Sequence, residues 1–389
     1  MNQGKYVYSQ LTDFLPKRVF DCLVDKYSGN KHIRFFTCWN QLLCMLFGQL
    51  TGRESMRDLM IGLDAHKSKY YHLGFSKSVT RSNLAKANEK RNHKIFEEFA
   101  YYLINEARKS SVVKNFELNI KSNVYAFDSS TIDLCLNVFW WAEFRKTKGG
   151  VKLHTLYDIK TSIPTYIYIT KASVHDVNLL DFLHYESGGY YILDRGYIDF
   201  KRLFKIHLHS AYFVTRTKSN FRFKRIYSNK INKKSGVLSD QIGRLEGFYS
   251  SKDYPEKLRK IKYHDEETGK TLIFLTNNVD LPAHEIALLY KYRWKVELFF
   301  KWIKQHLKIK SFWGTTPNAV KIQIYSAIIV YCLVTIISNK LKVERSIYEI
   351  LQILSISLLD KTPLKELLTN QDYKDVKELN CIQLKINYI

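Results

Sequence analysis

Residues 124–132 read Val-Tyr-Ala-Phe-Asp-Ser-Ser-Thr-Ile, a β-branched and aromatic run that is typical of a strand buried in a sheet. Four similar runs follow along the chain, at 151–159, 164–170, 190–194 and 211–217. Helical patterns are predicted between the later strands, at 175–183 and 199–207. This order of strands and helices predicts an α/β fold in which helices cover the faces of a mixed sheet.

The first 118 residues lack such strand patterns and predict helices instead. Apolar residues at helical spacing predict helices over 39–50 and 56–63, and a longer helix that includes 95–103. Before the long helix, residues 79–86 predict a short polar helix that a Ser or Thr can cap. A short basic helix between apolar ones is typical of a helix that reads a DNA groove, and equally of a solvated surface helix.

The chain is strongly basic, with 61 Lys plus Arg against 37 Asp plus Glu and a formal net charge of +24 over 389 residues. Its 46% hydrophobic content excludes an intrinsically disordered chain, so the charge must lie on packed structure. Such an excess predicts a polyanionic partner, with nucleic acid favoured over a membrane surface. Two segments concentrate the charge: 213–238, with eight basic residues and no acidic one, and 290–310.

Several other patterns exclude classes of protein. The most apolar run, 327–337, has 11 residues, whereas a membrane span needs about 20, so we predict a buried core helix and no membrane association. The N-terminus has no apolar stretch typical of a secretory signal. Six scattered cysteines without a Cys-x-x-Cys pair argue against zinc modules and disulfides, and for a reducing cytoplasm. Gly269-Lys270-Thr271 lacks the upstream glycine of a phosphate loop, which argues against a nucleotide cofactor.

Two carboxylates lie in apolar strands. Asp128 is inside the first predicted strand, and Asp194 ends the strand that begins at Tyr190. A carboxylate in such a place costs on the order of several kcal/mol unless it is paired, hydrogen-bonded or bound to metal. A strand-end cap would explain one such residue, but two on strands of one sheet favour a functional site.

A third acid lies in the basic segment 290–310. Glu297 is the sole acid there, among seven basic residues. The spacing predicts one continuous helix with a shared face formed by Tyr290, Arg293, Glu297, Lys301 and Lys304. The alternative is a solvated basic face in which Glu297 pairs with a neighbour four residues away, worth only about a few tenths of a kcal/mol.

Together the three acids predict a metal site. Carboxylates crowded at one end of a sheet repel each other, and divalent cations between them remove that repulsion. Two Mg²⁺ ions about 4 Å apart activate a water or a 3′-hydroxyl and stabilise the leaving oxygen of a phosphodiester. Flanking Arg and Lys side chains then suit the DNA backbone.

These residues resemble those of bacterial insertion-sequence transposases of the DDE type. The signature Tyr-x2-Arg-x3-Glu-x6-Lys, which marks one branch (YREK), is matched at every spacing by Tyr290, Arg293, Glu297 and Lys304. The contexts Asp128-Ser-Ser-Thr and Asp194-Arg-Gly-Tyr are also similar to the family's patterns. The resemblance covers about residues 120–340.

The resemblance implies an RNase H-like catalytic core with Asp128, Asp194 and Glu297 as catalytic and metal-binding residues, holding two Mg²⁺ ions for which Mn²⁺ can substitute. It implies DNA contacts by Tyr290, Arg293 and Lys304, with Lys301 as a further one. The implied organisation is a helical N-terminal DNA-binding domain over 1–118, a catalytic domain over 119–345 and a helical C-terminal segment over 346–389. The catalytic domain would carry a β-rich basic insertion at about 213–280.

The implied activity is cut-and-paste transposition. Such an enzyme binds the terminal inverted repeats of an insertion sequence, cleaves its ends and joins the 3′-OH to target DNA. Its partners would be double-stranded DNA of the element ends and of the target, and a second copy of the chain in the synaptic complex, in the bacterial cytoplasm at the nucleoid. Two alternatives keep the same fold: an RNase H-like nuclease without strand transfer, and a non-catalytic DNA-binding protein.

Overall fold

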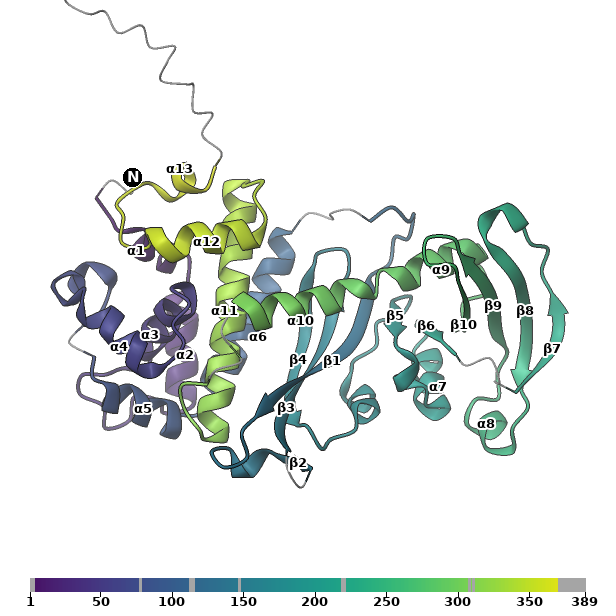
Figure 1. Ribbon diagram of the computed structural model, residues 1–389, viewed down its shortest axis with the longest axis horizontal. Helices are drawn as coiled ribbons and strands as arrows, with labels where there is room; N and C mark the ends of the chain where they lie inside the picture. The colour runs from purple at the N-terminus through teal and green to yellow at the C-terminus, as the bar shows by residue number, and fades with distance from the viewer. Residues whose placement is uncertain are drawn as a thin grey trace, which may run out of the picture.

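The computed structural model describes residues 4–76, 79–111, 116–145, 148–217, 222–306, 309 and 312–369. Figure 1 shows a helical part beside a long sheet. The helices are α1 Val7–Thr12, α2 Lys17–Lys26, α3 Cys38–Leu50, α4 Met56–Asp64, α5 Arg81–Lys90, α6 Lys94–Ser110, α7 Phe200–Leu208, α8 Phe248–Asp253, α9 Ala283–Lys291, α10 Trp294–His306, α11 Pro317–Leu341, α12 Ile347–Ser357 and α13 Leu364–Leu368. The strands are β1 Val124–Leu134, β2 Glu143–Arg145, β3 Lys148–Asp158, β4 Ile163–Lys171, β5 Tyr190–Leu193, β6 Tyr212–Arg216, β7 Phe223–Ser228, β8 Val237–Leu245, β9 Leu258–Asp265 and β10 Lys270–Thr276.

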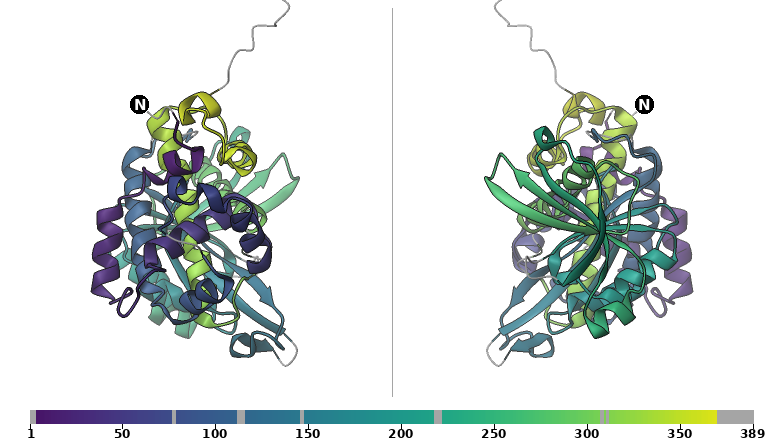
Figure 2. Two further views of the ribbon diagram at one scale, coloured as in Figure 1. Left: turned by 90° about the vertical axis from the view of Figure 1, so that its left-hand side faces the viewer. Right: turned by 90° about the vertical axis from the view of Figure 1, so that its right-hand side faces the viewer.

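All of these strands belong to one mixed sheet. Its order is β2-β3-β1-β5-β6-β10-β9-β8-β7, and β4 also pairs with β3. Strands β1, β5 and β6 are parallel to one another, whereas β3 and β4 on one side and β10, β9, β8 and β7 on the other add antiparallel pairs. The strands fan out in the right-hand view of Figure 2, which shows the twist of the sheet. The predicted mixed α/β fold is confirmed.

Four strands, β7 to β10, lie where the β-rich basic insertion is predicted. They extend the sheet beyond β6, and β7 forms its edge with residues that are half-buried or exposed. Residues 218–221 of the basic segment lie outside the described residues. The domain boundaries stay a prediction.

The parallel register of β1 and β5 decides where two of the acids lie. Phe127 pairs with Leu193, so Asp128 and Asp194 each come one position later on neighbouring strands. Strand β5 is buried throughout, and β1 is buried up to Phe127 and half-buried from Asp128 to Thr131. Both acids therefore lie where the apolar core ends.

The prediction of one continuous helix over 290–310 is wrong. Helix α9 ends at Lys291 and α10 begins at Trp294. Between them the N–H groups of Tyr292 and Arg293 donate to carbonyls only three residues back, at 3.2 and 3.1 Å, so the chain tightens into a turn. Figure 1 shows the two helices end to end across the sheet. Lys308 and Lys310 lie outside the described residues.

The predicted helix over 175–183 also differs, because Asp176–Phe182 forms a 3-10 helix, η4, instead. The buried core helix predicted at 327–337 is part of α11, which has 25 residues. By length and composition α11 could cross a membrane, but 94% of its most apolar window is buried inside the protein. It packs against α6, α3, α5 and α12, near the centre of both views in Figure 2. Packing within the protein therefore accounts for its apolar surface.

The remaining helices follow the sequence patterns. The predicted short polar helix is α5, and the Thr80 hydroxyl accepts a hydrogen bond from the Asn83 N–H as its N-cap. A capping box formed by Ser346 and Glu349 begins α12. The C-terminal segment packs on α1, since the Val7 N–H donates to the Asp360 carbonyl at 2.8 Å. Residues 370–389 lie outside the described residues. Cys22, Cys38, Cys44, Cys135 and Cys332, which the structure describes, are free thiols.

Candidate active site

Asp128 lies where β1 leaves the core. One carboxylate oxygen accepts the Ser129 N–H at 2.8 Å, and the other accepts from Arg293 Nη1 at 3.1 Å. Burial raises the pKa of Asp128 to about 6, and the nearby Glu297 and Asp194 carboxylates also raise it, whereas the Ser129 N–H and Arg293 lower it. In the absence of a cation, burial and the two neighbouring carboxylates therefore disfavour the ionised form of Asp128.

Glu297 comes to the same place from α10. Arg293 Nη2 donates to Glu297 Oε1 at 2.5 Å, so one guanidinium links Asp128 and Glu297. The third nitrogen, Arg293 Nε, is buried and has no hydrogen-bond partner among the described residues. Arg293 lies in the turn before α10, and its side chain reaches Asp128 and Glu297 from there.

Asp194 is held by the 3-10 helix that follows β5, η5 Arg195–Tyr197, and by α9. Its side chain accepts from the Gly196 N–H at 3.4 Å and from the Tyr290 hydroxyl at 3.3 Å. Tyr290 is buried, and its ring contacts Phe274 with centroids 5.1 Å apart. Burial raises the pKa of Tyr290, so the phenol stays protonated and donates to Asp194.

The two lysines predicted on the same helix face as Glu297, Lys301 and Lys304, lie in different surroundings. Lys304 Nζ donates to the Thr131 carbonyl of β1 at 2.6 Å and so fixes α10 against that strand. Lys301 is exposed. The structure thus brings Tyr290, Arg293 and Lys304 into contact with the acids or with β1, and leaves Lys301 at the surface.

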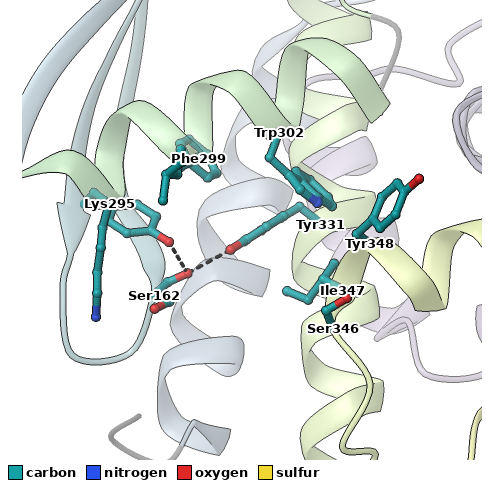
Figure 3. A pocket seen from close by; sticks show the side chains of 10 residues that line it. Ser162, Lys295, Phe299, Trp302, Tyr331, Ser346, Ile347 and Tyr348 are labelled. Carbon is teal, nitrogen blue, oxygen red and sulfur yellow. Dashed lines mark hydrogen bonds between the residues drawn. The ribbon is translucent and has the colours of Figure 1, made fainter. Parts of the chain in front are cut away.

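The other side of α10 is anchored by aromatic side chains (Figure 3). Phe299 contacts Tyr157 and Tyr331 with ring centroids 5.1 and 5.4 Å apart, and Trp302 contacts Tyr331 at 4.9 Å. The hydroxyls of Tyr157 and Tyr331 both donate to the Ser162 carbonyl, at 2.9 and 2.8 Å. This packing fixes the rotation of α10 and thereby turns Glu297 toward β1.

Comparison with known proteins identifies the family. The model of the transposase DDE domain matches residues 120–333, which is more than half of the chain. The chain belongs to the DDE transposase family. A second family model, described only as a domain of unknown function, matches residues 3–76 of this transposase-family chain.

Three curated relatives are also transposases by name. The chain is 40% identical over 200 residues to the putative transposase y4zB of Sinorhizobium fredii, which covers 50% of the chain and 56% of that relative. It is 28% identical over 221 residues to a probable transposase for insertion sequence element IS5377 of Geobacillus stearothermophilus, which covers 57% of the chain and 58% of that relative. It is 26% identical over 347 residues to a putative transposase for insertion sequence element IS4SA of Synechocystis sp., which covers 86% of the chain and 88% of that relative. The chain thus spans little more than half the length of the first two relatives.

One part of the candidate site was not predicted from the sequence. Asp176, the first residue of η4, accepts from the Ser129 hydroxyl at 2.8 Å and pairs with Lys152 at 3.0 Å. His154 is buried beside it, with Nδ1 3.7 Å from Asp176, and burial lowers the pKa of His154 to about 4. The sequence did carry a signal, because Lys152 and His154 are two positions apart in a strand and therefore place two polar side chains on the same face. Only the β1–β3 register, which pairs Ser129 with His154, reveals what that face meets.

The donor chemistry of the acids fits a divalent cation. DDE transposase domains are generally dependent on divalent metal, and the three acids offer only carboxylate oxygens, which Mg²⁺ and Mn²⁺ prefer. Within the described ranges no three such groups are close enough to hold an ion together, since Arg293 lies between Asp128 and Glu297. The guanidinium therefore supplies positive charge where a cation would be expected.

Proposed function

We propose that this chain is a DNA transposase that binds the terminal inverted repeats of an insertion sequence, cleaves its ends by two-metal phosphodiester hydrolysis and joins the 3′-OH to target DNA. The observation that carries the proposal is the convergence of Asp128 and Glu297 on one guanidinium, with Asp194 on the neighbouring parallel strand. Membership of the DDE family supports it.

The sheet order supports an RNase H-like core. Five neighbouring strands run in the order β4-β3-β1-β5-β6. Strands β1, β5 and β6 are parallel to one another, and β3 is antiparallel to both of its neighbours, β1 and β4. The first acid comes from the central strand, the second from the end of its parallel neighbour, and the third from a helix that packs on β1. Assignment to the YREK branch rests on Tyr290, Arg293, Glu297 and Lys304.

Asp128, Asp194 and Glu297 would hold two Mg²⁺ ions, which Mn²⁺ can replace. Bound there, the ions would activate the attacking water or 3′-hydroxyl and neutralise charge on the phosphate. Tyr290 orients the Asp194 carboxylate by donating its hydroxyl proton. Lys304 holds α10 against β1 by donating a hydrogen bond to the Thr131 carbonyl.

The proposed DNA contacts are Tyr290, Arg293, Lys301 and Lys304, and Arg293 and Lys301 are the ones that suit phosphate best. A guanidinium presents a planar set of donors that matches phosphate oxygens as well as carboxylates. We infer that Arg293 neutralises the acids before DNA is bound and contacts the DNA backbone afterwards. Lys301 is exposed on α10 and is available to the DNA backbone. The net charge of +24 supports double-stranded DNA as the partner. Joining two ends implies a homodimer, in the bacterial cytoplasm at the nucleoid.

The proposal is tested with DNA that flanks the reading frame, incubated with the full-length protein and Mg²⁺. Asp128→Ala, Asp194→Ala and Glu297→Ala should each abolish cleavage while DNA binding persists. Asp133→Ala is the matched control, because Asp133 is an exposed carboxylate on the same strand. Metal-dependent nicking by Asp128→Ala would rule out the assigned acids.

Strand transfer is tested separately with pre-cut ends and a supercoiled target plasmid. A transposase should form joined products with the wild-type protein and none with Glu297→Ala. Cleavage without any joined product would favour the nuclease alternative.

A further inference from the structure

A hollow of about 450 Å³ lies in the helical part of the molecule, between the loop 30–37 and α5. Loop residues 32–36 line one side, and Asn83, Lys86 and Lys90 of α5 line the other. In Figure 1, α5 is on the opposite side of α11 from β1. The hollow is therefore separate from the proposed cutting site.

The loop is fastened to the end of α5 by a buried arginine. Arg91 Nη1 donates to the Thr37 carbonyl at 3.0 Å and to Gln41 Oε1 at 2.9 Å, while Nη2 donates to the Phe36 carbonyl. The Gln41 amide in turn donates to Asn88 Oδ1 of α5 at 2.7 Å. Such a satisfied buried network fixes the loop relative to the helix.

This network presents basic and apolar side chains together at the surface. Lys31, Arg34, Lys86 and Lys90 are exposed, and none forms an ion pair within the part of the chain that the structure describes. Between them the loop exposes Phe35 (57%) and Ile33 (41%). Glu89 is the one acid in α5, and it does not line the hollow.

The charge of this surface favours a polyanion over a protein. Lysine is depleted in the cores of protein–protein interfaces, because it keeps its hydration and loses side-chain entropy when it is fixed. Phosphates instead gain from each lysine or arginine through release of counterions. An exposed Phe or Ile among such residues is typical of proteins that press an apolar side chain against bases in a groove.

We propose that the loop 31–36 and the Asn83–Lys90 side of α5 form a second DNA-binding surface, called here the loop–α5 surface, which holds duplex DNA away from the cutting site. Lys31, Arg34, Lys86 and Lys90 contact phosphates, and Phe35 with Ile33 contacts bases or sugars in the groove. The inference rests on the proposed function and assigns its end-recognition step to named residues.

The test measures DNA affinity with the full-length protein in EDTA, where cleavage is excluded. The probe is a fluorescein-labelled duplex from the DNA flanking the reading frame, followed by anisotropy over a series of salt concentrations. A plot of log K against log salt has a negative slope, and the double variant Lys86→Gln/Lys90→Gln should make that slope shallower by about 1.8, or about 0.9 for each lost phosphate contact. Phe35→Ala should weaken binding about tenfold, as expected for loss of an aromatic contact to a base, and leave the slope unchanged.

Two controls keep the result specific. Lys109→Gln removes one positive charge from α6, where Lys109 pairs with Glu106, and should leave both affinity and slope unchanged. Lys86→Arg/Lys90→Arg retains the charge and should bind within about twofold of wild type, since phosphate contacts depend on charge. Circular dichroism spectra should coincide for all variants, because the substituted side chains are exposed.

The outcomes separate this inference from the proposed function. Unchanged affinity and slope in both the double variant and Phe35→Ala would overturn the loop–α5 surface, even if the wild-type protein cuts DNA. Loss of affinity in these variants would uphold the surface, even if the wild-type protein fails to cut with Mg²⁺. Loss of self-association by light scattering with unchanged DNA affinity would make the surface a protein interface and overturn the inference.

Discussion

Arg293 Nη1 lies 3.1 Å from Asp128 Oδ2, although the two residues are 165 positions apart in the sequence. The same guanidinium reaches Glu297, so it neutralises two acids that would otherwise repel each other. Both side chains are largely buried at this contact, which strengthens the attraction and makes loss of either partner costly. The relationship makes Arg293 a competitor of any cation that the acids bind.

Arg293→Ala should therefore destabilise the metal-free protein by about 3 kcal/mol, because it leaves two carboxylates close together without a counter-charge. Mg²⁺ should raise the Tm of this variant more than that of the wild type, since the ion replaces the lost guanidinium. Thermal unfolding with and without Mg²⁺ measures both effects. The double variant Arg293→Ala/Asp128→Asn should lose the additional Mg²⁺ response. An equal Tm shift in Arg293→Ala and wild type would show that Arg293 and the cation do not compete.

Asp176→Asn should lower the rate of DNA nicking about 10- to 100-fold, as is typical when a residue that orients a metal ligand is changed. The substitution preserves the side-chain size but removes the charge that holds Lys152 and the hydroxyl of Ser129, the residue whose N–H donates to Asp128. DNA affinity should stay the same, because Asp176 contacts protein groups. Single-turnover nicking and anisotropy measure the two quantities. Asp181→Asn, an exposed acid of the same 3-10 helix, is the control. A nicking rate equal to that of wild type would exclude a positioning role.

Tyr290→Phe should slow nicking about tenfold while changing the free energy of unfolding by less than about 1 kcal/mol. The variant loses the hydroxyl that donates to Asp194 but keeps the ring that packs on Phe274. Nicking rates and urea unfolding measure the two effects. Tyr249→Phe, at an exposed position, should change neither quantity. A large loss of stability with normal nicking would mean that the Tyr290 hydroxyl stabilises the fold and does not position Asp194 for nicking.

Stability should fall in acid through His154. Its pKa is lowered to about 4 by burial, compared with 6.5 for an ordinary histidine. Below pH 6.5 the unfolded chain therefore takes up a proton that the folded protein does not, and stability declines until pH about 4. The difference in pKa corresponds to about 3 kcal/mol. Urea unfolding at pH 7 and pH 4.5 should show a smaller decline for His154→Asn than for wild type. Equal declines would indicate that His154 is protonated in the folded state.

Asp128 and Asp194 could be found from the sequence because their signal is local. A carboxylate within four or five apolar, β-branched or aromatic residues is visible without knowing the sheet, and its cost implies a partner. The strands, the α5 helix and its Thr80 cap were predictable for the same reason. The register of β1 with β5 then places the two acids side by side.

Three features of the molecule depended on tertiary structure, two of them in the site. Helical spacing places Tyr290, Arg293 and Glu297 on one face, but a turn at 292–293 separates α9 from α10, and only the folded chain brings Arg293 to Asp128. Asp176 reaches Ser129 only through the pairing of β1 with β3. Away from that site, Arg91 joins the end of α5 to the loop 30–37, whose carbonyls lie 54 and 55 positions earlier in the chain.

The sequence by itself determined the α/β fold, the three acids and the basic character of the chain, because apolar periodicity, embedded carboxylates and net charge are properties of neighbouring residues. Only the tertiary structure decided which cation neutralises the acids, which residues orient them and where the excess charge forms a surface. Those contacts join segments far apart in the chain, and the free energy that selects them comes from burial and packing in the folded protein.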